Sequence, residues 1–296
     1  MRTTSVRIKT KYEVDGRCMA CQFEAFERLL NKNNVPYAQR QEFFGFYNLT
    51  MGRSATLTMP EIYQKLNKEF RRLTNIDDLY FEEKKHSNKV AKVLYDEWRP
   101  KISSTKDAFT SALKLSIAGN IMDYGASCDF DVHETINKVM TSEFTIDHSL
   151  ELKKQIKTAK NILYLGDNTG EIVFDKLFIE TIQHDNLTFA VRGAAVLNDA
   201  TMEDALEVGM NNIAQLISNG SNVPSTVLNQ SSPEFLEAYN NADLIISKGQ
   251  GNLEGLIEED DSRIFFLLMV KCDVIGELLT VPKGSFVVYN SALEKN

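Results

Sequence analysis

The chain has 296 residues, which is enough for one large domain or two ordinary domains with a buried core. Hydrophobic residues make up 43% and charged residues 25%, the balance of an ordinary soluble globular protein. The formal net charge of −8 argues against a nucleic-acid-binding protein, whose contact face would be basic. It remains compatible with a small anionic ligand, because a pocket can be basic on an acidic protein.

The chain shows no pattern of a membrane protein. Its longest uninterrupted apolar run, IFFLLMV at 264–270, is far shorter than the roughly 20 residues that a membrane-spanning helix needs. The first residues, MRTTSVRIKTKYEVDG, contain no apolar segment typical of a secretory signal. We therefore expect a cytoplasmic protein without a membrane partner.

One cysteine pair stands out near the N-terminus. Cys18 and Cys21 form a C-x-x-C motif, whereas Cys128 and Cys272 stand alone. A single C-x-x-C is half of a common zinc site or a redox pair, and it follows no strand here. We therefore favour structural thiols or a local metal clip over redox catalysis.

The chain before residue 160 has a helical pattern, with apolar residues recurring every three to four positions. Pro36, Pro60 and Pro100 lie between the predicted helices or at their starts, as expected of helix boundaries. The pattern predicts a helical domain over residues 1–158. Its predicted helices are 21–32, 59–74, 81–98, 105–120 and 149–160.

After residue 160, short apolar runs alternate with helical stretches. Continuously apolar strands separated by helices indicate a mainly parallel sheet with helices on both faces. We therefore predict a Rossmann-like, doubly wound, three-layer α/β domain over residues 159–296. The predicted strands are 161–166, 187–191, 212–217, 243–247, 263–270 and 286–290. The predicted helices between them are 169–184, 201–208, 232–241 and roughly 252–259.

Polar residues follow several of these strands. Taken singly, each group has a simple structural explanation as a turn or a helix cap. Together they place acids, amides and bases at the carboxyl edge of one sheet, where such folds bind ligands. The groups are Asp167, Asn168 and Glu171 after the first strand, Arg192 and Asp199 after the second, Lys248, Gly249, Gly251 and Asn252 after the fourth, and Lys271 after the fifth.

These residue types suit a phosphoryl group held beside a metal ion. Asp167, Asn168 and Asp199 offer the oxygen ligands that Mg²⁺ or Mn²⁺ prefers. Lys248 and Lys271 offer point charges for a phosphate. Backbone amides at the Gly249–Gly251 turn and the following helix start could cradle the same anion. We therefore predict a phosphoryl site with a divalent metal.

Other nucleotide and hydrolase motifs are absent from the sequence. The turn GDNTGE lacks the G-x-G-x-x-G spacing of a dinucleotide site, and no G-x-x-x-x-G-K-[ST] motif occurs. The D-x-D motif of haloacid-dehalogenase-type phosphatases is missing, because the first strand is followed by only one acid before Thr169. A G-x-S-x-G nucleophile motif is absent as well.

Four stretches in this order resemble the metal-dependent damage-control phosphatase family, also called domain of unknown function 89. They are LYLGDNTGEIVFDK, VRGAAVLNDAT, ISKGQGNLEGL and LLMVKCDVIGELL. CMAC at 18–21 and AGNIMDYG at 118–125 resemble the family's N-terminal cysteine pair and Gly-Asn motif, so the likeness covers most of the chain. It implies a helical domain joined to a Rossmann-like domain, and hydrolysis of small phosphometabolites such as sugar phosphates.

The resemblance also implies roles for individual residues. The metal ligands would be Asp167, Asn168 and Asp199, with Mn²⁺, Mg²⁺, Co²⁺ or Ni²⁺ as the cation. Asp167, Asn168 and Lys248 would be catalytic. The substrate would contact Asn120, Glu171, Arg192, Gly249, Gly251, Asn252 and Lys271.

Two questions stay open at this point. We expect water to attack the phosphorus, because the second acid usual in aspartyl-phosphate enzymes is absent, but attack by Asp167 itself is the alternative. The same motifs would also occur in a phosphometabolite sensor without turnover, and a carboxyl methyltransferase is a third candidate. The sequence carries no indication of the oligomeric state.

Overall fold

The computed structural model describes residues 14–53, 57–119 and 132–294. The chain divides into two compact units. The first, which we call the helical unit, comprises Met1–Leu79 and Lys271–Lys283. The second, the sheet unit, comprises Tyr80–Val270 and Gly284–Asn296. Within the described ranges, no helix is both long enough and apolar enough to span a bilayer.

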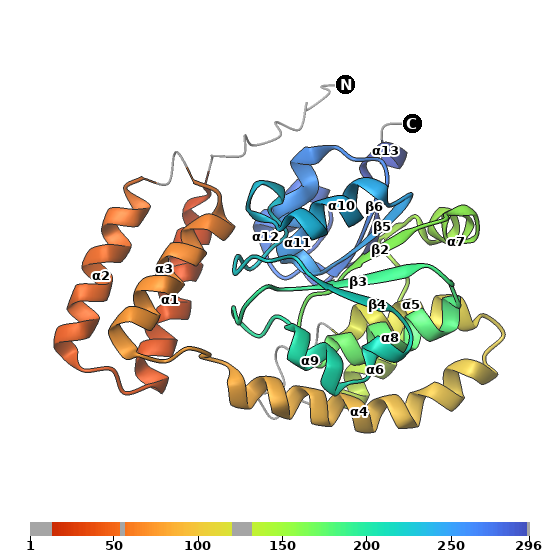
Figure 1. The fold of residues 1–296 in the computed structure, drawn as a ribbon, viewed down its shortest axis with the longest axis horizontal. Helices are drawn as coiled ribbons and strands as arrows, with labels where there is room; N and C mark the ends of the chain where they lie inside the picture. Colours follow the sequence, from red (N-terminus) through yellow and green to blue (C-terminus); the bar gives the residue numbers. More distant parts are fainter. Residues whose placement is uncertain (1–13, 54–56, 120–131, 295–296) are drawn as a thin grey trace. The chain divides into compact units, whose positions relative to one another are not determined.

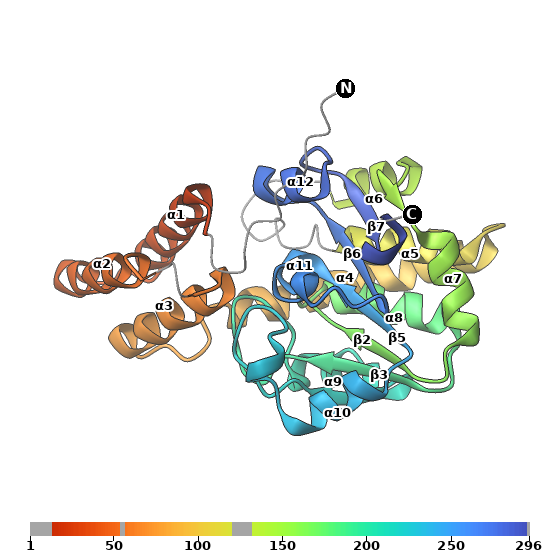
Figure 2. The same cartoon turned by 90° about the horizontal axis from the view of Figure 1, so that it is seen from above.

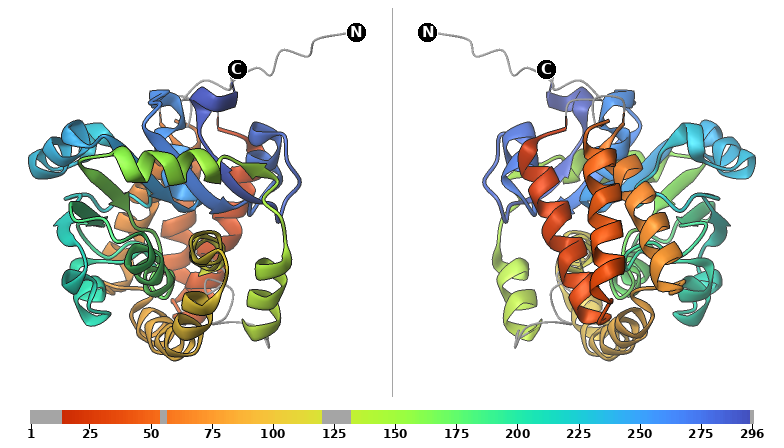
Figure 3. Two further views of the ribbon diagram at one scale, coloured as in Figure 1. Left: turned by 90° about the vertical axis from the view of Figure 1, so that its right-hand side faces the viewer. Right: turned by 90° about the vertical axis from the view of Figure 1, so that its left-hand side faces the viewer.

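The helical unit contains α1 (Gly16–Lys32), α2 (Tyr37–Met51), α3 (Met59–Thr74) and α12 (Asp273–Leu279). The first three helices run side by side (Figure 3). Their contact is aromatic: the Phe26 ring lies 5.0 Å from Phe43 and 5.3 Å from Tyr63, measured between centroids. Arg17 of α1 pairs with Glu277 of α12 at 2.6 Å, which joins the distant segment of the chain to this bundle.

The sheet unit is built on a seven-stranded sheet in the described part of the chain, ordered β1-β7-β6-β5-β2-β3-β4 (Figure 1). Every neighbouring pair is parallel except β6 and β7. The predicted mainly parallel, doubly wound sheet is thus confirmed. The strands are β1 (Ile146–Asp147), β2 (Ile162–Leu165), β3 (Leu187–Val191), β4 (Gln215–Ser218), β5 (Leu244–Lys248), β6 (Ile264–Met269) and β7 (Phe286–Tyr289).

Helices cover both faces of this sheet. Figures 1 and 2 show α5 and α8 on one face and α10 and α11 on the other. This arrangement follows from right-handed crossovers, because the connection from β2 to β3 runs across the sheet in the opposite direction to that from β5 to β6. The helices of this unit are α4 (Phe81–Ser104), α5 (Ala108–Ala118), α6 (Val132–Thr141), α7 (Ser149–Thr158), α8 (Glu171–Ile182), α9 (Met202–Glu207), α10 (Pro233–Asn241), α11 (Gly249–Leu256) and α13 (Ser291–Glu294).

The register of the two central strands decides which side chains face α8. Tyr164 of β2 lies opposite Ile246 of β5, so both project to the same face. Lys248 lies two residues after Ile246 and therefore projects to this face as well. Tyr164 and Ile246 belong to one apolar core with Phe174 and Phe178 of α8.

The compact units do not follow the domain boundary predicted at residues 158 and 159. Helices α4 and α5 pack on α8, and Leu94 and Leu113 share the core of the sheet. Amphipathic periodicity shows that a helix has an apolar face, but it does not show which partner covers that face. The helical half of the sequence is therefore divided between the two units.

Some element boundaries also differ from the predictions. Helix α4 continues through Pro100 to Ser104, although a boundary was expected there. Proline removes one hydrogen bond, here to the exposed carbonyl of Asp96 near the helix end, where water can replace it. Helices α2 and α6 and the two-residue strand β1 were not predicted.

Candidate active site

The predicted polar residues gather where the sheet reverses its direction of winding. β2 and β5 are adjacent and parallel, and they are followed by α8 and α11 on opposite faces. Such a switch point leaves a crevice at the carboxyl ends of the two strands, where α/β proteins bind ligands. The segment after β2 begins with Gly166, Asp167 and Asn168, and α11 begins at Gly249.

Asp167 lies directly against the start of α11. The φ angle of Gly249 is +78°, and a Cβ atom built there would lie 1.8 Å from Asp167 Oδ2. Only glycine therefore fits the close approach of this carboxylate to the first turn of the helix. Gly249 was predicted from the sequence as part of an anion cradle. The structure gives a separate reason for glycine at this position, which is its close packing against Asp167.

Backbone hydrogen bonds join the loops after β2 and β3. Asn168 and Asp199 form an antiparallel bridge. The Ala200 N–H donates to the Asp167 carbonyl at 2.8 Å, and the Thr169 N–H donates to the Asn198 carbonyl at 2.9 Å. The two acidic segments, separated by about 30 residues in sequence, therefore lie side by side as expected for one site.

The carboxamide of Asn168 has a defined orientation. Its Nδ2 donates to Asp167 Oδ2 at 2.9 Å and to Glu171 Oε2 at 3.1 Å. Both N–H groups of the amide are used on carboxylates, which fixes Oδ1 as the atom facing away from them. Oδ1 accepts no hydrogen bond from the described residues. An amide oxygen of this kind is a ligand type that hard divalent cations accept.

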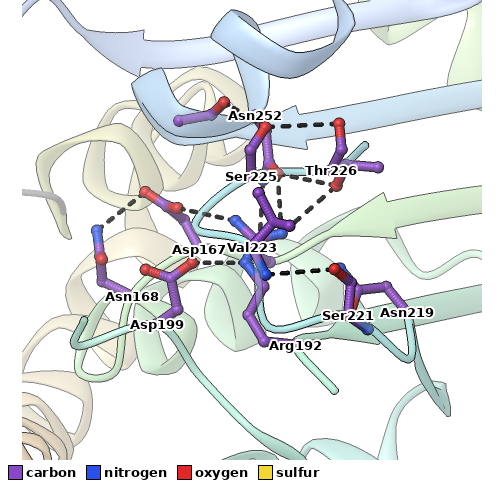
Figure 4. A network of polar contacts seen from close by, with 12 residues as sticks. Asp167, Asn168, Arg192, Asp199, Asn219, Ser221, Val223, Ser225, Thr226 and Asn252 are labelled. Atoms are coloured by element: carbon purple, nitrogen blue, oxygen red, sulfur yellow. Dashed lines mark hydrogen bonds and ion pairs between the residues drawn. The ribbon is translucent and has the colours of Figure 1, made fainter. Parts of the chain in front are cut away.

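Arg192 links the two acids (Figure 4). Its Nε donates to Asp199 Oδ2 at 2.5 Å, and its Nη2 lies 3.5 Å from Asp167 Oδ1. Its Nη1 donates to Asn252 Oδ1 at 3.0 Å. The side chain is only 3% exposed. The residue predicted to bind substrate thus neutralises the acids predicted to bind metal.

Asn252 connects the ends of the two central strands. Its Nδ2 donates to the Gly166 carbonyl at 3.2 Å and to the Lys248 carbonyl at 2.8 Å. Its Oδ1 accepts from Arg192. With both ends of its amide engaged by the protein, Asn252 holds the crevice in shape.

Lys248 is completely buried beneath the crevice. Its Nζ donates to Glu171 Oε1 at 2.7 Å, to Asp175 Oδ1 at 2.5 Å and to the Ser116 carbonyl at 3.0 Å. Burial by itself lowers the pKa of Lys248, but the carboxylates of Asp175 and Glu171 outweigh it, so the pKa is raised. All three ammonium protons are thus used within the protein, which does not fit the phosphate contact expected from sequence.

A loop that the sequence predictions did not include completes the network. It follows β4, and its buried residues are Asn219, Ser221, Val223, Ser225 and Thr226. Asn219 Oδ1 accepts from the Gly193 N–H at 3.0 Å, and Thr226 Oγ1 donates to Asn252 Oδ1 at 2.9 Å (Figure 4). The polar run SNGSNVPST after the third predicted strand was the available signal.

Helix α4 also reaches this site, although it was assigned to another domain. Asn88 Oδ1 accepts from the Gly170 N–H at 2.8 Å, at the N-terminus of α8. Asn88 is fully buried. It therefore caps the helix that carries Glu171, a role that α4 can take because it packs on α8.

Two predicted residues are not placed at the site. Asn120 lies outside the described residues. Lys271 belongs to the helical unit. Gly251 is in the first turn of α11, where a Cβ atom would lie 2.7 Å from the Pro224 carbonyl oxygen. The contacts of Asn120 and Lys271 with substrate stay predictions.

Comparison with known proteins identifies the family. Residues 14–287 match the damage-control phosphatase ARMT1-like domain. A damage-control phosphatase of Pyrococcus horikoshii is 40% identical over 215 residues, which cover 71% of this chain and 74% of the relative. A damage-control phosphatase of Archaeoglobus fulgidus is 31% identical over 229 residues, or 75% of this chain and 79% of the relative.

The fold agrees with this match. A crystal structure of a DUF89 family protein from Pyrococcus horikoshii superposes with a TM-score of 0.86 at 32% identity, covering 94% of this chain and 99% of that chain. The resemblance seen in the four sequence motifs is confirmed. The chain belongs to the damage-control phosphatase ARMT1-like family, whose DUF89 fold it shares.

Proposed function

We propose that this chain is a metal-dependent phosphatase that hydrolyses small phosphorylated metabolites. The observation that carries the proposal is the meeting of Asp167, Asn168 and Asp199 at the switch point, beside the start of α11. The relatives named damage-control phosphatases support the activity. Sugar phosphates or related damaged metabolites are the substrates that we expect.

The residues at this site fit a hard divalent cation. Asp167 and Asp199 would contribute carboxylate oxygens. Asn168 would contribute Oδ1, because its Nδ2 already donates to Asp167 and Glu171. Among the described residues, no group of three or more His, Cys, Asp or Glu could hold a metal ion, so the candidate set there is two acids and one amide. We expect Mn²⁺, Mg²⁺, Co²⁺ or Ni²⁺.

The charges buried in the sheet unit also favour a cation. The described buried acids are Asp167, Glu171, Asp175, Asp199 and Asp204, and the buried bases are Lys84, Arg192 and Lys248. Buried charges are costly unless they are balanced or coordinate a metal. A divalent cation would offset this excess of acid, and when bound it would neutralise charge developing on a phosphoryl oxygen.

The protein itself would hold the remaining phosphoryl oxygens. The backbone N–H groups in the first turn of α11 have no partner within the helix, and a helix N-terminus favours an anion. Arg192 adds a buried positive charge next to Asp167. Both groups would orient the phosphoryl group against the attacking water.

In the reaction we propose, water attacks the phosphorus and the bond to the substrate oxygen breaks. The alcohol leaves with a proton, and inorganic phosphate is the second product. In this scheme Asp167 is a metal ligand and not the nucleophile. Both of its carboxylate oxygens already have a neighbour, because Oδ2 accepts from Asn168 and Oδ1 faces Arg192. Attack by Asp167 itself would require one of these oxygens to leave its partner.

The test measures phosphate release from p-nitrophenyl phosphate and a panel of sugar phosphates. The protein is first treated with EDTA, and Mn²⁺, Mg²⁺, Co²⁺ or Ni²⁺ is then restored. Asp199→Asn is compared with Asp243→Asn, a carboxylate that accepts N–H groups at the opposite edge of the sheet. We expect turnover that needs the metal, is lost in Asp199→Asn and persists in Asp243→Asn.

Failure of this test would point to another class. Tight binding of a cation and a phosphometabolite without turnover by the wild-type protein would replace the phosphatase with a sensor. A methyltransferase is disfavoured because the turn after β2 carries Asp167 and Asn168 in place of a glycine-rich cosubstrate loop.

A further inference from the structure

We infer that Asp175 is a positioning residue that acts through Lys248 and Glu171 to fix the carboxamide of Asn168. This inference rests on the proposed function, because it takes Asn168 Oδ1 as a metal ligand. It assigns a role to an acid in the middle of α8 and gives Lys248 a role other than contact with phosphate.

The geometry begins with two acids on one face of α8. Glu171 and Asp175 are four residues apart, so they lie one above the other along the helix. Lys248, at the end of β5, projects between them and donates to both, at 2.7 Å and 2.5 Å. One buried ammonium group therefore sets the distance between the two carboxylates.

Asp175 is held more firmly than a simple ion pair requires. Its Oδ1 accepts from Ser116 Oγ at 2.7 Å and from the Tyr164 hydroxyl at 2.8 Å, in addition to Lys248. Burial, together with the Asp175 charge, raises the pKa of Tyr164 well above its ordinary value, so the phenol remains a donor. Three elements, α5, β2 and β5, thus fix this one oxygen.

The second carboxylate oxygen of Asp175, Oδ2, lowers the stability of the folded protein. Asp175 Oδ2 is buried and has no hydrogen-bond partner in the described structure. An unsatisfied buried oxygen destabilises the folded state, and more so when the group is charged. A buried acid that is only half satisfied contributes poorly to stability, which suggests a requirement at the site.

The connection to the site runs through Glu171. One of its oxygens accepts from Lys248 at 2.7 Å, and the other accepts from Asn168 Nδ2 at 3.1 Å. If Asp175 lost its charge, Lys248 would lose one of its two carboxylate partners and shift toward the other. Glu171 would then move, and the Asn168 amide would lose one of the two acceptors that orient Oδ1.

The structure offers a matched control at the opposite edge of the sheet. Asp261 also pairs with a base and a tyrosine: Arg263 Nη2 lies 2.6 Å from Asp261 Oδ2, and the Tyr239 hydroxyl donates to that oxygen at 3.1 Å. Asp261 precedes β6, so its cluster lies at the amino ends of the strands, away from the crevice. Asp261→Asn therefore repeats the chemical change without the connection to Asn168.

The experiment measures the affinity for Mn²⁺ by calorimetry on the full-length wild type, Asp175→Asn and Asp261→Asn. Stability is measured separately by urea unfolding in EDTA. Loss of groups that orient metal ligands lowers metal affinity about 10- to 100-fold. We expect a loss in this range for Asp175→Asn and an unchanged affinity for Asp261→Asn, even if both lose stability.

The outcomes separate this inference from the proposed function. A wild-type protein that binds neither Mn²⁺ nor Mg²⁺, Co²⁺ or Ni²⁺, each titrated in the same way, overturns the proposed function. A wild-type protein that binds Mn²⁺, with Asp175→Asn binding equally well, overturns only the positioning role and makes the cluster a structural one. If Asp175→Asn does not fold, Tyr164→Phe removes one donor to Asp175 and should lower the affinity by up to about 10-fold. An unchanged affinity in that variant also overturns the inference.

Discussion

The guanidinium of Arg192 lies against the carboxylate of Asp199, with Nε 2.5 Å from Oδ2 and both side chains buried. It is the principal described cation between the acids that we assign to the metal. Removing one partner of a buried ion pair commonly costs about 3–5 kcal/mol. This contact should therefore decide how stable the two acids are when no metal ion is bound.

We expect Arg192→Gln to destabilise the protein strongly in EDTA and much less with Mn²⁺ present. Asp167 and Asp199 lose their shared guanidinium, and a bound cation would replace part of that charge. A ligand bound at 100 times its Kd adds about 2.7 kcal/mol. Urea unfolding with and without Mn²⁺ measures both values. An equal loss of unfolding free energy with and without Mn²⁺ would show that Arg192 does not interact with a metal site.

Gly249→Ala should abolish metal binding in addition to costing stability. The φ angle of Gly249 is +78°, and the new Cβ would displace the carboxylate of Asp167. Gly284→Ala is the control, because its φ angle is +87° and no atom lies within 4 Å of the built Cβ. Gly284→Ala should lose about 1 kcal/mol from backbone strain alone and keep its affinity for Mn²⁺. Calorimetry and urea unfolding are run on both variants, and similar Mn²⁺ affinities would contradict the prediction.

Asn168→Asp should make the stability of the protein depend on the metal. The new carboxylate would replace an amide that donates to Asp167 and Glu171, so three acids would face one another. In EDTA we expect a loss of about 1–3 kcal/mol, because hydrogen bonds are replaced by repulsion. Thermal unfolding in EDTA and in Mn²⁺ should differ more for this variant than for the wild type. A smaller difference would place Asn168 outside the ligand set.

Tyr95 should contribute a loss of stability at alkaline pH. Burial and its hydrogen bonds to Glu180 raise the pKa of Tyr95 to about 12. The phenol of the unfolded chain releases its proton near pH 10, so the raised pKa favours the folded state below that pH. This contribution is complete below about pH 10 and is lost as the pH rises towards 12.

The measurement is the slope of unfolding free energy against pH between 10 and 12, compared between wild type and Tyr95→Phe. The variant should show a shallower fall, because one proton-releasing group is gone. The other described tyrosines with raised pKa values keep the remaining slope in both proteins; they are Tyr47, Tyr164, Tyr239 and Tyr289. Identical slopes would mean that the Tyr95–Glu180 contact does not hold in solution.

The centre of the sheet was predictable because nearly all residues of β2, β5 and β6 are buried. The run LTFAV at 187–191 is apolar except for Thr188 and coincides with β3, whereas β1 has two residues and no pattern of its own. Helix α3 coincides with the predicted range 59–74, because its apolar residues recur every three to four positions and Pro60 marks its start. Helix α2 has no side-chain cap at Pro36 and has a glycine inside, so its pattern is weak.

The site was predictable to the level of residue types that share one edge of a sheet. That Asp167, Asn168 and Asp199 meet follows from parallel strands and their order. The face to which Lys248 projects could not be predicted in the same way. Side chains alternate along a strand, so an error of one residue in the strand's end reverses the face. Asp175 gave no signal, since a single acid inside a helix is indistinguishable in sequence from one on its exposed face.

The division of the chain into units has a consequence for its dissection. The chain passes from the helical unit to the sheet unit after Leu79, returns after Val270, and leaves again after Lys283. A single protease cut between residues 79 and 80 would therefore leave both products holding part of the helical unit, with Arg17 on one fragment and its partner Glu277 on the other. Expression of residues 80–296 alone would carry α12 without the bundle to which it belongs. Cuts at all three crossings, after residues 79, 270 and 283, are needed to release the units from each other.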